Sequence, residues 1–234
     1  MHVHNDPGEG QARGSVAPAL TLTATLLFLW ASYVAASRLP NSTGWENGPV
    51  ENLQVAMLLA GGLVALHGGH VHQPGRLRTF WRLMAPIWFV LAVRELSWGA
   101  CFLPPYDVAI ETGPKFSSSV QLWYRPAVPY LLLALLGLLL FQFVRTGQIY
   151  FLAALWKRRQ VPWVELSCAV LCMLASGAAE GHLHVDLAFE HHWMAQNFEE
   201  LSETGAYALV LMAQWRVFRD SILQSRDASG GLGR

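Results

Sequence analysis

Acidic residues and histidines gather near the ends of long apolar stretches in this 234-residue chain. Carboxylate and imidazole groups together bind zinc, copper or iron, and helical bundles build such centres from facing helices. The sequence therefore predicts a candidate metal site with ligands from Glu95, Glu180, His182, His184, Glu199 and Glu203. The pocket around it is expected to include Glu51, Arg94, Glu95, Ser97, Glu180, Glu199 and Glu203. The metal ion would be catalytic or structural, and no catalytic residue is assigned.

Histidines two residues apart occur three times, as His2/His4, His70/His72 and His182/His184. Such a pair can chelate a metal ion from an extended segment. The loop that holds His182 and His184 either completes a metal site or is an ordinary polar loop. The segment from His67 to His72 is interpreted as an interfacial loop. The three cysteines form no CxxC pair, and Cys168 and Cys172 are expected to be small apolar residues on one helix face.

The composition indicates which elements must position these groups. Hydrophobic residues make up 53% of the chain and charged residues 14%, against about 25% charged in soluble proteins. A membrane span needs about 20 mostly apolar residues in a helix. We therefore predict an all-α, polytopic membrane bundle in which residues 15–217 form one transmembrane domain between a flexible N-terminus (1–14) and a C-terminal tail (218–234). The six predicted spans are 15–36, 47–67, 80–98, 126–144, 162–181 and 197–217, and residues 149–156 are either a helical extension or an interfacial segment.

The orientation follows from the positively charged loops, which stay in the cytoplasm. With the N-terminus inside, 12 of the 16 Lys and Arg residues lie on the inner side, whereas 11 of the 16 acids lie on the outer side. The formal charge is then +7 inside and −7 outside, which places both termini on the cytoplasmic side of the membrane. Aromatic belts are expected at both interfaces, formed by Trp45, Trp98, Trp123 and Tyr124 outside and by Trp81, Trp156, Trp163 and Trp215 inside.

Helical rise places one carboxylate from each of four spans at nearly the same depth. These are Glu51, Glu95, Glu180 and Glu203. Two pairs also resemble helix starts, in which Asn47 precedes Glu51 and Asn197 precedes Glu200, so these acids are candidates for first-turn capping. Glu46, Asp107 and Glu111 are expected to be solvated loop charges. Arg94 and Glu95 are adjacent, about 100° apart on a helix, and are not expected to face one partner.

Three short motifs occur at the predicted outer helix ends. They are Glu46-Asn47-Gly48-Pro49-Val50-Glu51, Arg94-Glu95-Leu96-Ser97-Trp98-Gly99 and Glu199-Glu200-Leu201-Ser202-Glu203. In these the chain resembles a group of bacterial multi-pass inner-membrane proteins without an established activity, which carry E-D/N-G-x-x-E, E-I/L-S-W-G and E-E-x-x-E. Arg94 stands where that group has another acid, and Ala100-Cys101 replaces its polar pair. The resemblance implies the architecture and singles out these residues, without implying a reaction.

Three functions compete. The first is a periplasm-facing metal site, the second a transporter or proton-coupled permease that uses the carboxylates as a relay, and the third a non-enzymatic subunit or scaffold that binds a membrane protein partner. The expected partners are the lipid bilayer and a small-molecule or lipid substrate. Sequence patterns of P-loop, GxSxG, HExxH and dinucleotide-binding proteins are not found, and nothing supports nucleic-acid binding.

Overall fold

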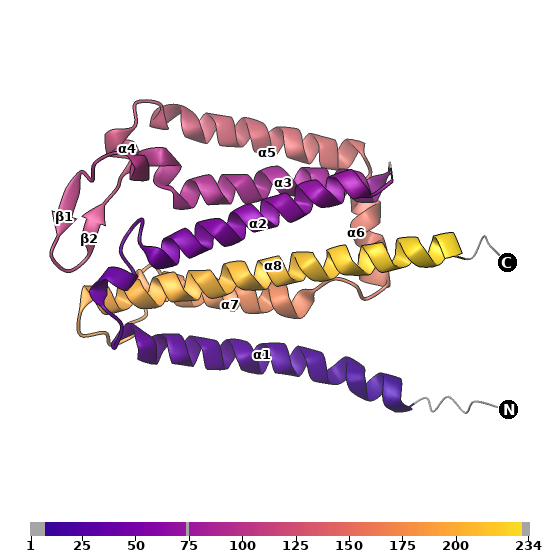
Figure 1. Cartoon of the computed structure of the whole chain (residues 1–234), viewed down its shortest axis with the longest axis horizontal. Coiled ribbons are helices and arrows are strands. Elements are labelled where there is room, and N and C mark those ends of the chain that lie inside the picture. Colours follow the sequence, from indigo (N-terminus) through magenta and orange to yellow (C-terminus); the bar gives the residue numbers. More distant parts are fainter. Residues whose placement is uncertain (1–7, 74, 231–234) are drawn as a thin grey trace.

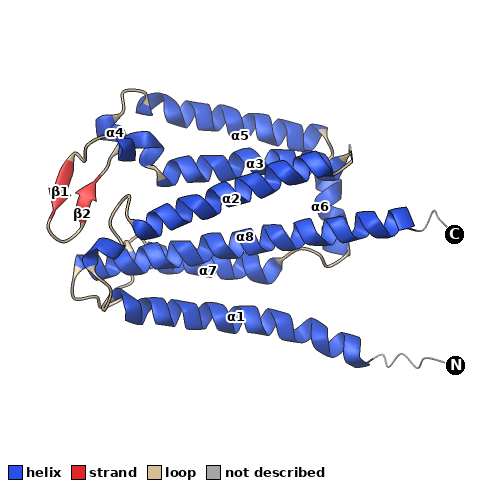
Figure 2. Ribbon diagram, in the orientation of Figure 1, coloured by secondary structure: helices blue, strands red, loops and turns tan. Residues whose placement is uncertain are grey.

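The structure is a computed structural model that describes residues 8–73 and 75–230 (Figure 1). It confirms an all-α bundle, with one short antiparallel hairpin that the sequence analysis did not predict (Figure 2). The α-helices are α1 (Gly8–Ala36), α2 (Pro49–Val71), α3 (Arg76–Glu95), α4 (Ser118–Gln121), α5 (Val128–Arg145), α6 (Gln148–Lys157), α7 (Trp163–Ala179) and α8 (His192–Gly230). The hairpin strands are β1 (Asp107–Ala109) and β2 (Gly113–Lys115), and 3₁₀ turns cover Asn41–Thr43, Ser97–Phe102 and Arg125–Ala127.

Each predicted span coincides with one long helix, but several ends differ. Helix α3 stops at Glu95 rather than at Trp98, and α8 begins at His192, before the predicted start at Asn197. Residues 149–156 do not extend α5, because Gly147 adopts a left-handed conformation (φ 66°) and starts the separate helix α6, which runs across the bundle (Figure 1). The predicted terminal segments lie partly in α1 and α8, and residues 1–7 and 231–234 of them lie outside the described residues.

Three helical segments within the described residues are long and apolar enough to cross a membrane. They are Pro18–Ala36, Pro49–Val71 and Arg125–Arg145. The third includes α5, whose large apolar side chains, among them Leu131, Leu133 and Leu140, are exposed. Soluble proteins rarely expose so large a continuous apolar surface to water. These helices therefore indicate a membrane protein.

The long helices lie side by side and divide the bundle into two ends (Figure 1). At one end α1, α3 and α7 finish and α2, α5 and α8 start, and the hairpin lies there too. This end carries the acids predicted to be outside, so we call it the acidic end. The opposite end, which we call the basic end, carries most of the Lys and Arg residues, including Arg76, Arg78, Arg82, Arg145, Lys157, Arg216 and Arg219.

The core lies where α8 meets α2 and α3 on one side and α7 on the other. Glycines let α2 and α3 approach closely, since a Cβ on Gly61 would lie 2.5 Å from the Trp88 ring. Trp81 is fully buried in this core, so its prediction as an interfacial residue is wrong. Cys168 and Cys172 are buried between α7 and α8, which confirms their prediction as apolar packing residues.

The histidines near the basic end belong to a helix rather than to an interfacial loop. Helix α2 continues to Val71, past His67 and His70. His72, just beyond it, is buried: its Nδ1 lies 2.8 Å from the Gly68 carbonyl oxygen and its Nε2 lies 3.1 Å from the Ser221 hydroxyl. These contacts tie α2 to α8, so the predicted loop is wrong here.

Candidate functional site: a carboxylate layer at the acidic end

Six glutamates from four helix ends form one layer at the acidic end of the bundle. We call this the carboxylate layer, and its members are Glu51, Glu95, Glu180, Glu199, Glu200 and Glu203. Glu203 lies within electrostatic range of Glu95 and Glu180, and Glu51 within range of both Glu95 and Glu203. Glu199 lies within electrostatic range of Glu180, which directly follows α7. The depth argument made from the sequence thus agrees with the arrangement of the side chains.

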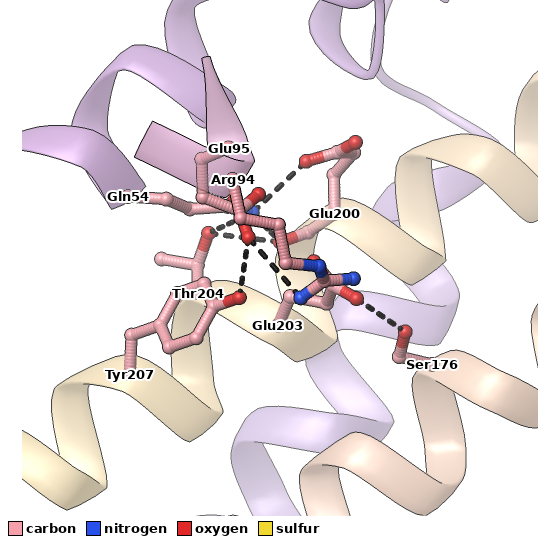
Figure 3. A network of polar contacts seen from close by, with 8 residues as sticks. All are labelled: Gln54, Arg94, Glu95, Ser176, Glu200, Glu203, Thr204 and Tyr207. Atoms are coloured by element: carbon pink, nitrogen blue, oxygen red, sulfur yellow. Dashed lines mark hydrogen bonds and ion pairs between the residues drawn. The ribbon is translucent and has the colours of Figure 1, made fainter. Parts of the chain in front are cut away.

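Glu95 and Glu203 converge at the centre of the layer (Figure 3). The Tyr207 hydroxyl donates a hydrogen bond of 2.7 Å to Glu95 Oε1, and the Ser176 hydroxyl donates one of 3.1 Å to Glu203 Oε1. Glu203 is only 8% exposed. Two carboxylates on different helices are thus held close to each other, each by a neutral hydroxyl donor.

Arg94 joins this centre. Its NH1 lies 3.4 Å from Glu95 Oε1, and its guanidinium also lies within electrostatic range of Glu203, Glu180 and Tyr207. The prediction that Arg94 and Glu95 face different partners is wrong, because Glu95 is the last residue of α3 and the long arginine side chain reaches back to it (Figure 3). Arg94 is the only Lys or Arg that forms an ion pair with a layer glutamate in the part of the chain that the structure describes.

Gln54 links α2 to Glu200. It is fully buried, and its Nε2 donates 2.9 Å hydrogen bonds to both the backbone carbonyl and Oε2 of Glu200, and one of 3.2 Å to the Thr204 hydroxyl. Glu200 is therefore a cross-helix partner rather than a first-turn cap, because α8 begins two turns earlier. Asn197, the predicted cap, instead donates from its Nδ2 to the carbonyls of Ala36 and Pro40, each at 3.2 Å, and closes the end of α1.

Glu51 has both of the roles that the sequence left open. Its Oε2 accepts a hydrogen bond from the backbone N–H of Asn47, which satisfies the start of α2. It also lies within electrostatic range of Glu95 and Glu203. A helix-capping acid can thus contribute charge to the layer at the same time.

Ser97 lies in an unusual turn directly after the layer. Ser97, Trp98 and Gly99 all have positive φ angles, of 46°, 58° and 100°. Left-handed backbone at a non-glycine residue costs about 1–3 kcal/mol and tends to occur at functional sites. The turn is held by the Tyr124 hydroxyl, which donates a 2.6 Å hydrogen bond to the Trp98 carbonyl. The sequence motif here therefore encodes a strained turn that ends α3 at Glu95.

The histidine loop lies at the edge of the layer. His182 Nδ1 lies 2.7 Å from Glu180 Oε2, but its side chain is 74% exposed, and His184 has a left-handed backbone (φ 54°). This loop also lines a cleft of about 450 Å³ that contains other acidic residues and histidines, namely Glu111, Asp186, Glu190, His191 and His192. Among residues 18–73 and 75–221, whose side chains the structure describes, no three His, Cys, Asp or Glu side chains are arranged to hold a metal ion.

The loops outside the helices also hold titratable groups. Burial raises the pKa of Glu46, although the Phe116 N–H, which donates a 2.6 Å hydrogen bond to it, and Lys115 act in the opposite direction. The prediction of Glu46 as a solvated charge is therefore wrong. Asp107 pairs with Lys115 at 3.6 Å across the hairpin, and Glu111 is exposed. Burial and nearby Glu51 raise the pKa of the Cys101 thiol.

Four uncharged residues beside the carboxylate layer were missed by the sequence analysis. These are Gln54, Ser176, Thr204 and Tyr207. Glu200, Glu203, Thr204 and Tyr207 follow the i, i+3, i+4, i+7 spacing that puts residues on one helix face. That spacing was visible in the sequence. Ser176 carries no such signal, because its role depends on how α7 packs on α8.

Known proteins give no further guide to this site. No protein family, no curated protein and no solved structure matches the chain. The function is therefore argued from the geometry of the carboxylate layer.

Proposed function

We propose that the chain is a multi-pass protein of the bacterial inner membrane, with about six spans, both termini in the cytoplasm and the carboxylate layer facing the periplasm. The parallel course of α1, α2, α3, α5, α7 and α8 supports six spans (Figure 1). The basic end supports a cytoplasmic position for both termini. Helix α6 lies across the basic end and is proposed to rest at the interface.

We further propose that the carboxylate layer binds a cation. The observation that carries this proposal is the convergence of Glu95 and Glu203, from α3 and α8, among four more carboxylates and a single ion-paired arginine, Arg94. Carboxylates that cluster with little access to water are stabilised either by protonation or by a compensating positive charge, and a bound cation would supply the second. The metal ions expected from the sequence, Zn, Cu or Fe, prefer nitrogen ligands, so they would have to recruit His182 beside Glu180 and draw the ligands closer together on binding. Their role would be catalytic or structural, and a divalent ion that prefers oxygen ligands, such as Mg²⁺, or an organic cation is the next candidate.

Elemental analysis of the full chain, purified without chelators, tests the metal. We expect about one ion per chain, and a strong loss of it in Glu95→Gln and Glu203→Gln. Glu111→Gln removes one exposed acid of the same end and serves as the matched control. A wild-type chain that carries no metal and binds none on titration would overturn the metal assignment.

Cysteine labelling tests the orientation. In a background without the three native cysteines, Ile110→Cys places a thiol on the hairpin, where Ile110 is 95% exposed, and Arg145→Cys places one at the basic end. A membrane-impermeant maleimide should label the first in intact cells and the second only after permeabilisation. The reverse pattern would invert the proposed topology.

The transporter and the scaffold are weaker alternatives. Beyond the layer, the interface of α2, α3 and α8 is filled by apolar side chains such as Leu58, Ala85 and Ala92, which does not favour a relay through the membrane. Unchanged flux in proteoliposomes of Glu95→Gln would exclude the relay. A stable monomer without a co-purifying protein would exclude an obligate scaffold.

A further inference from the structure

A second site lies at the basic end, far from the carboxylate layer along α8. A groove of about 770 Å³ opens between α1, α2, α7 and α8. Its walls are mainly apolar and include Met57, Val64, Leu211 and Met212. Pockets of about 300–1,000 Å³ are typical of small-molecule sites. This groove therefore has the size and the lining to take one hydrocarbon chain.

Charged groups gather where the groove reaches the basic end. Arg216, Arg219 and Glu165 all line it there. Arg216 NH1 donates a 2.9 Å hydrogen bond to Glu165 Oε1. The Arg219 side chain is 62% exposed, and its only polar contacts with described residues are two of 3.5 Å to Asp220 Oδ1. Two guanidinium groups thus stand at one end of an apolar groove, and at least one keeps N–H donors available for an anion.

Glu165, at the same end of the groove, needs a hydrogen-bond donor, whereas the two arginines need an anion. Its side chain is only 11% exposed, and its Oε2 has no hydrogen-bond partner among the described residues. A buried acceptor without a donor costs about 1–3 kcal/mol, and more when it is charged. A ligand that brought an N–H donor to this end of the groove would satisfy Glu165, whereas a purely anionic ligand would not.

We propose that the groove binds a phospholipid with a primary ammonium headgroup, of the phosphatidylethanolamine type. The phosphate binds Arg219 and Arg216, the ammonium donates to Glu165, and an acyl chain fills the apolar groove. Basic residues between spans on the cytoplasmic side are typical of lipid headgroup sites, and the partly exposed Trp215 beside them suits the interface. This inference rests on the proposed insertion of the bundle in a membrane.

Native mass spectrometry of the delipidated full chain in detergent tests the ligand. The probes are phosphatidylethanolamine, phosphatidylcholine and phosphatidylglycerol with the same acyl chains. Phosphatidylcholine keeps the phosphate but has no N–H donor, so we expect it to bind about tenfold more weakly than phosphatidylethanolamine, the equivalent of one charge-assisted hydrogen bond. Equal affinity for these two lipids would overturn the proposal. So would tightest binding of phosphatidylglycerol, which would assign the site to the arginines alone.

Variants locate the site. Arg219→Gln should weaken phosphatidylethanolamine binding several-fold, while Arg145→Gln, an exposed arginine at the same end but outside the groove, should not. Ala60→Phe changes an exposed residue of the groove wall and should block binding while leaving the bundle folded. Undiminished binding in both Arg219→Gln and Ala60→Phe would overturn the proposal. Failure of the cysteine-labelling pattern would instead overturn the membrane topology, so the two failures are distinguishable.

Discussion

The acidic end and the basic end of the bundle differ in how far their charged side chains are buried. At the acidic end, carboxylates such as Glu203 turn inward and take partners from neighbouring helices. At the basic end, Arg145, Lys157 and Arg219 are exposed, and buried ion pairing is confined to Glu165 with Arg216 among the described residues. Exposed basic side chains can bind the lipid headgroups at a membrane surface, whereas ionisable side chains that are buried together form a candidate functional site. The comparison predicts that equivalent substitutions cost more at the acidic end.

The largest expected contrast is between two fully buried glutamines. Gln54→Leu removes the donor of the Glu200 carboxylate, whereas Gln148→Leu removes only a 3.1 Å hydrogen bond to the Arg76 carbonyl and one to the Thr146 hydroxyl. We expect losses of about 3 and about 1 kcal/mol in the free energy of unfolding, because Gln54 donates to three acceptors on α8, one of them a carboxyl oxygen, whereas Gln148 donates to one carbonyl and one hydroxyl close to it in the sequence. Each glutamine also has an unpartnered Oε1, so that contribution cancels. Unfolding in detergent measures both, and equal losses would contradict the contrast.

A smaller contrast compares two hydroxyls on α8. Tyr207→Phe removes the hydrogen bond to Glu95 at the acidic end, and Ser221→Ala removes the contact with His72 at the basic end. We expect the free energy of unfolding to fall by about 1.5 kcal/mol in Tyr207→Phe and by about 0.5 kcal/mol in Ser221→Ala, since a hydrogen bond to a carboxylate is stronger than one between neutral groups. Tyr207→Phe should also alter cation binding, whereas Ser221→Ala should leave it unchanged. Thermal unfolding and metal content measured on the same samples check both outcomes.

The smallest expected effect is a pH dependence at Glu46. Because burial raises the pKa of Glu46 in the folded chain above 4.5, its folded form binds a proton more readily than its unfolded form. The contribution of Glu46 to stability therefore falls as the pH rises from 4.5 through the raised pKa, and Glu46→Gln removes this change. The unfolding temperature of wild type minus that of Glu46→Gln should be higher at pH 4.5 than at pH 7, by about 2 °C or less. A difference that is constant with pH would contradict it, since all other groups are common to both chains.

Much of the fold was predictable from apolar length. The stretches 126–144 and 162–181 match α5 and α7 within a few residues, because little else than a helix suits so apolar a segment. The ends of α3 and α8 were mispredicted for a different reason. The strained turn at Trp98 and the polar first turns of α8 are set by tertiary contacts that hydropathy does not report.

The site was predictable in depth but not in partners. Helical rise placed Glu95 and Glu203 at one level, as the structure has them. It could not show that Arg94 folds back onto Glu95, or that Ser176 reaches Glu203, because both depend on side-chain direction and on how two helices pack. Neutral donors such as Gln54 were not identified, because an uncharged amide one turn after Glu51 does not by itself indicate a partner on another helix.

The contact between Asn197 and the end of α1 sets an order of events during synthesis. Asn197 donates to the carbonyl of Ala36, 161 residues earlier in the chain, and α1 packs on α7 and α8. At about 5–20 residues per second, a ribosome needs roughly 8–32 s to make the intervening chain. Until Asn197 has been made, the Ala36 carbonyl at the C-terminal end of α1 lacks this donor, and α1 lacks its packing against α8. The packing of α1 is thus completed only when α8 has been made, and translation stalled between α7 and α8 would leave α1 accessible to chaperones and membrane proteases.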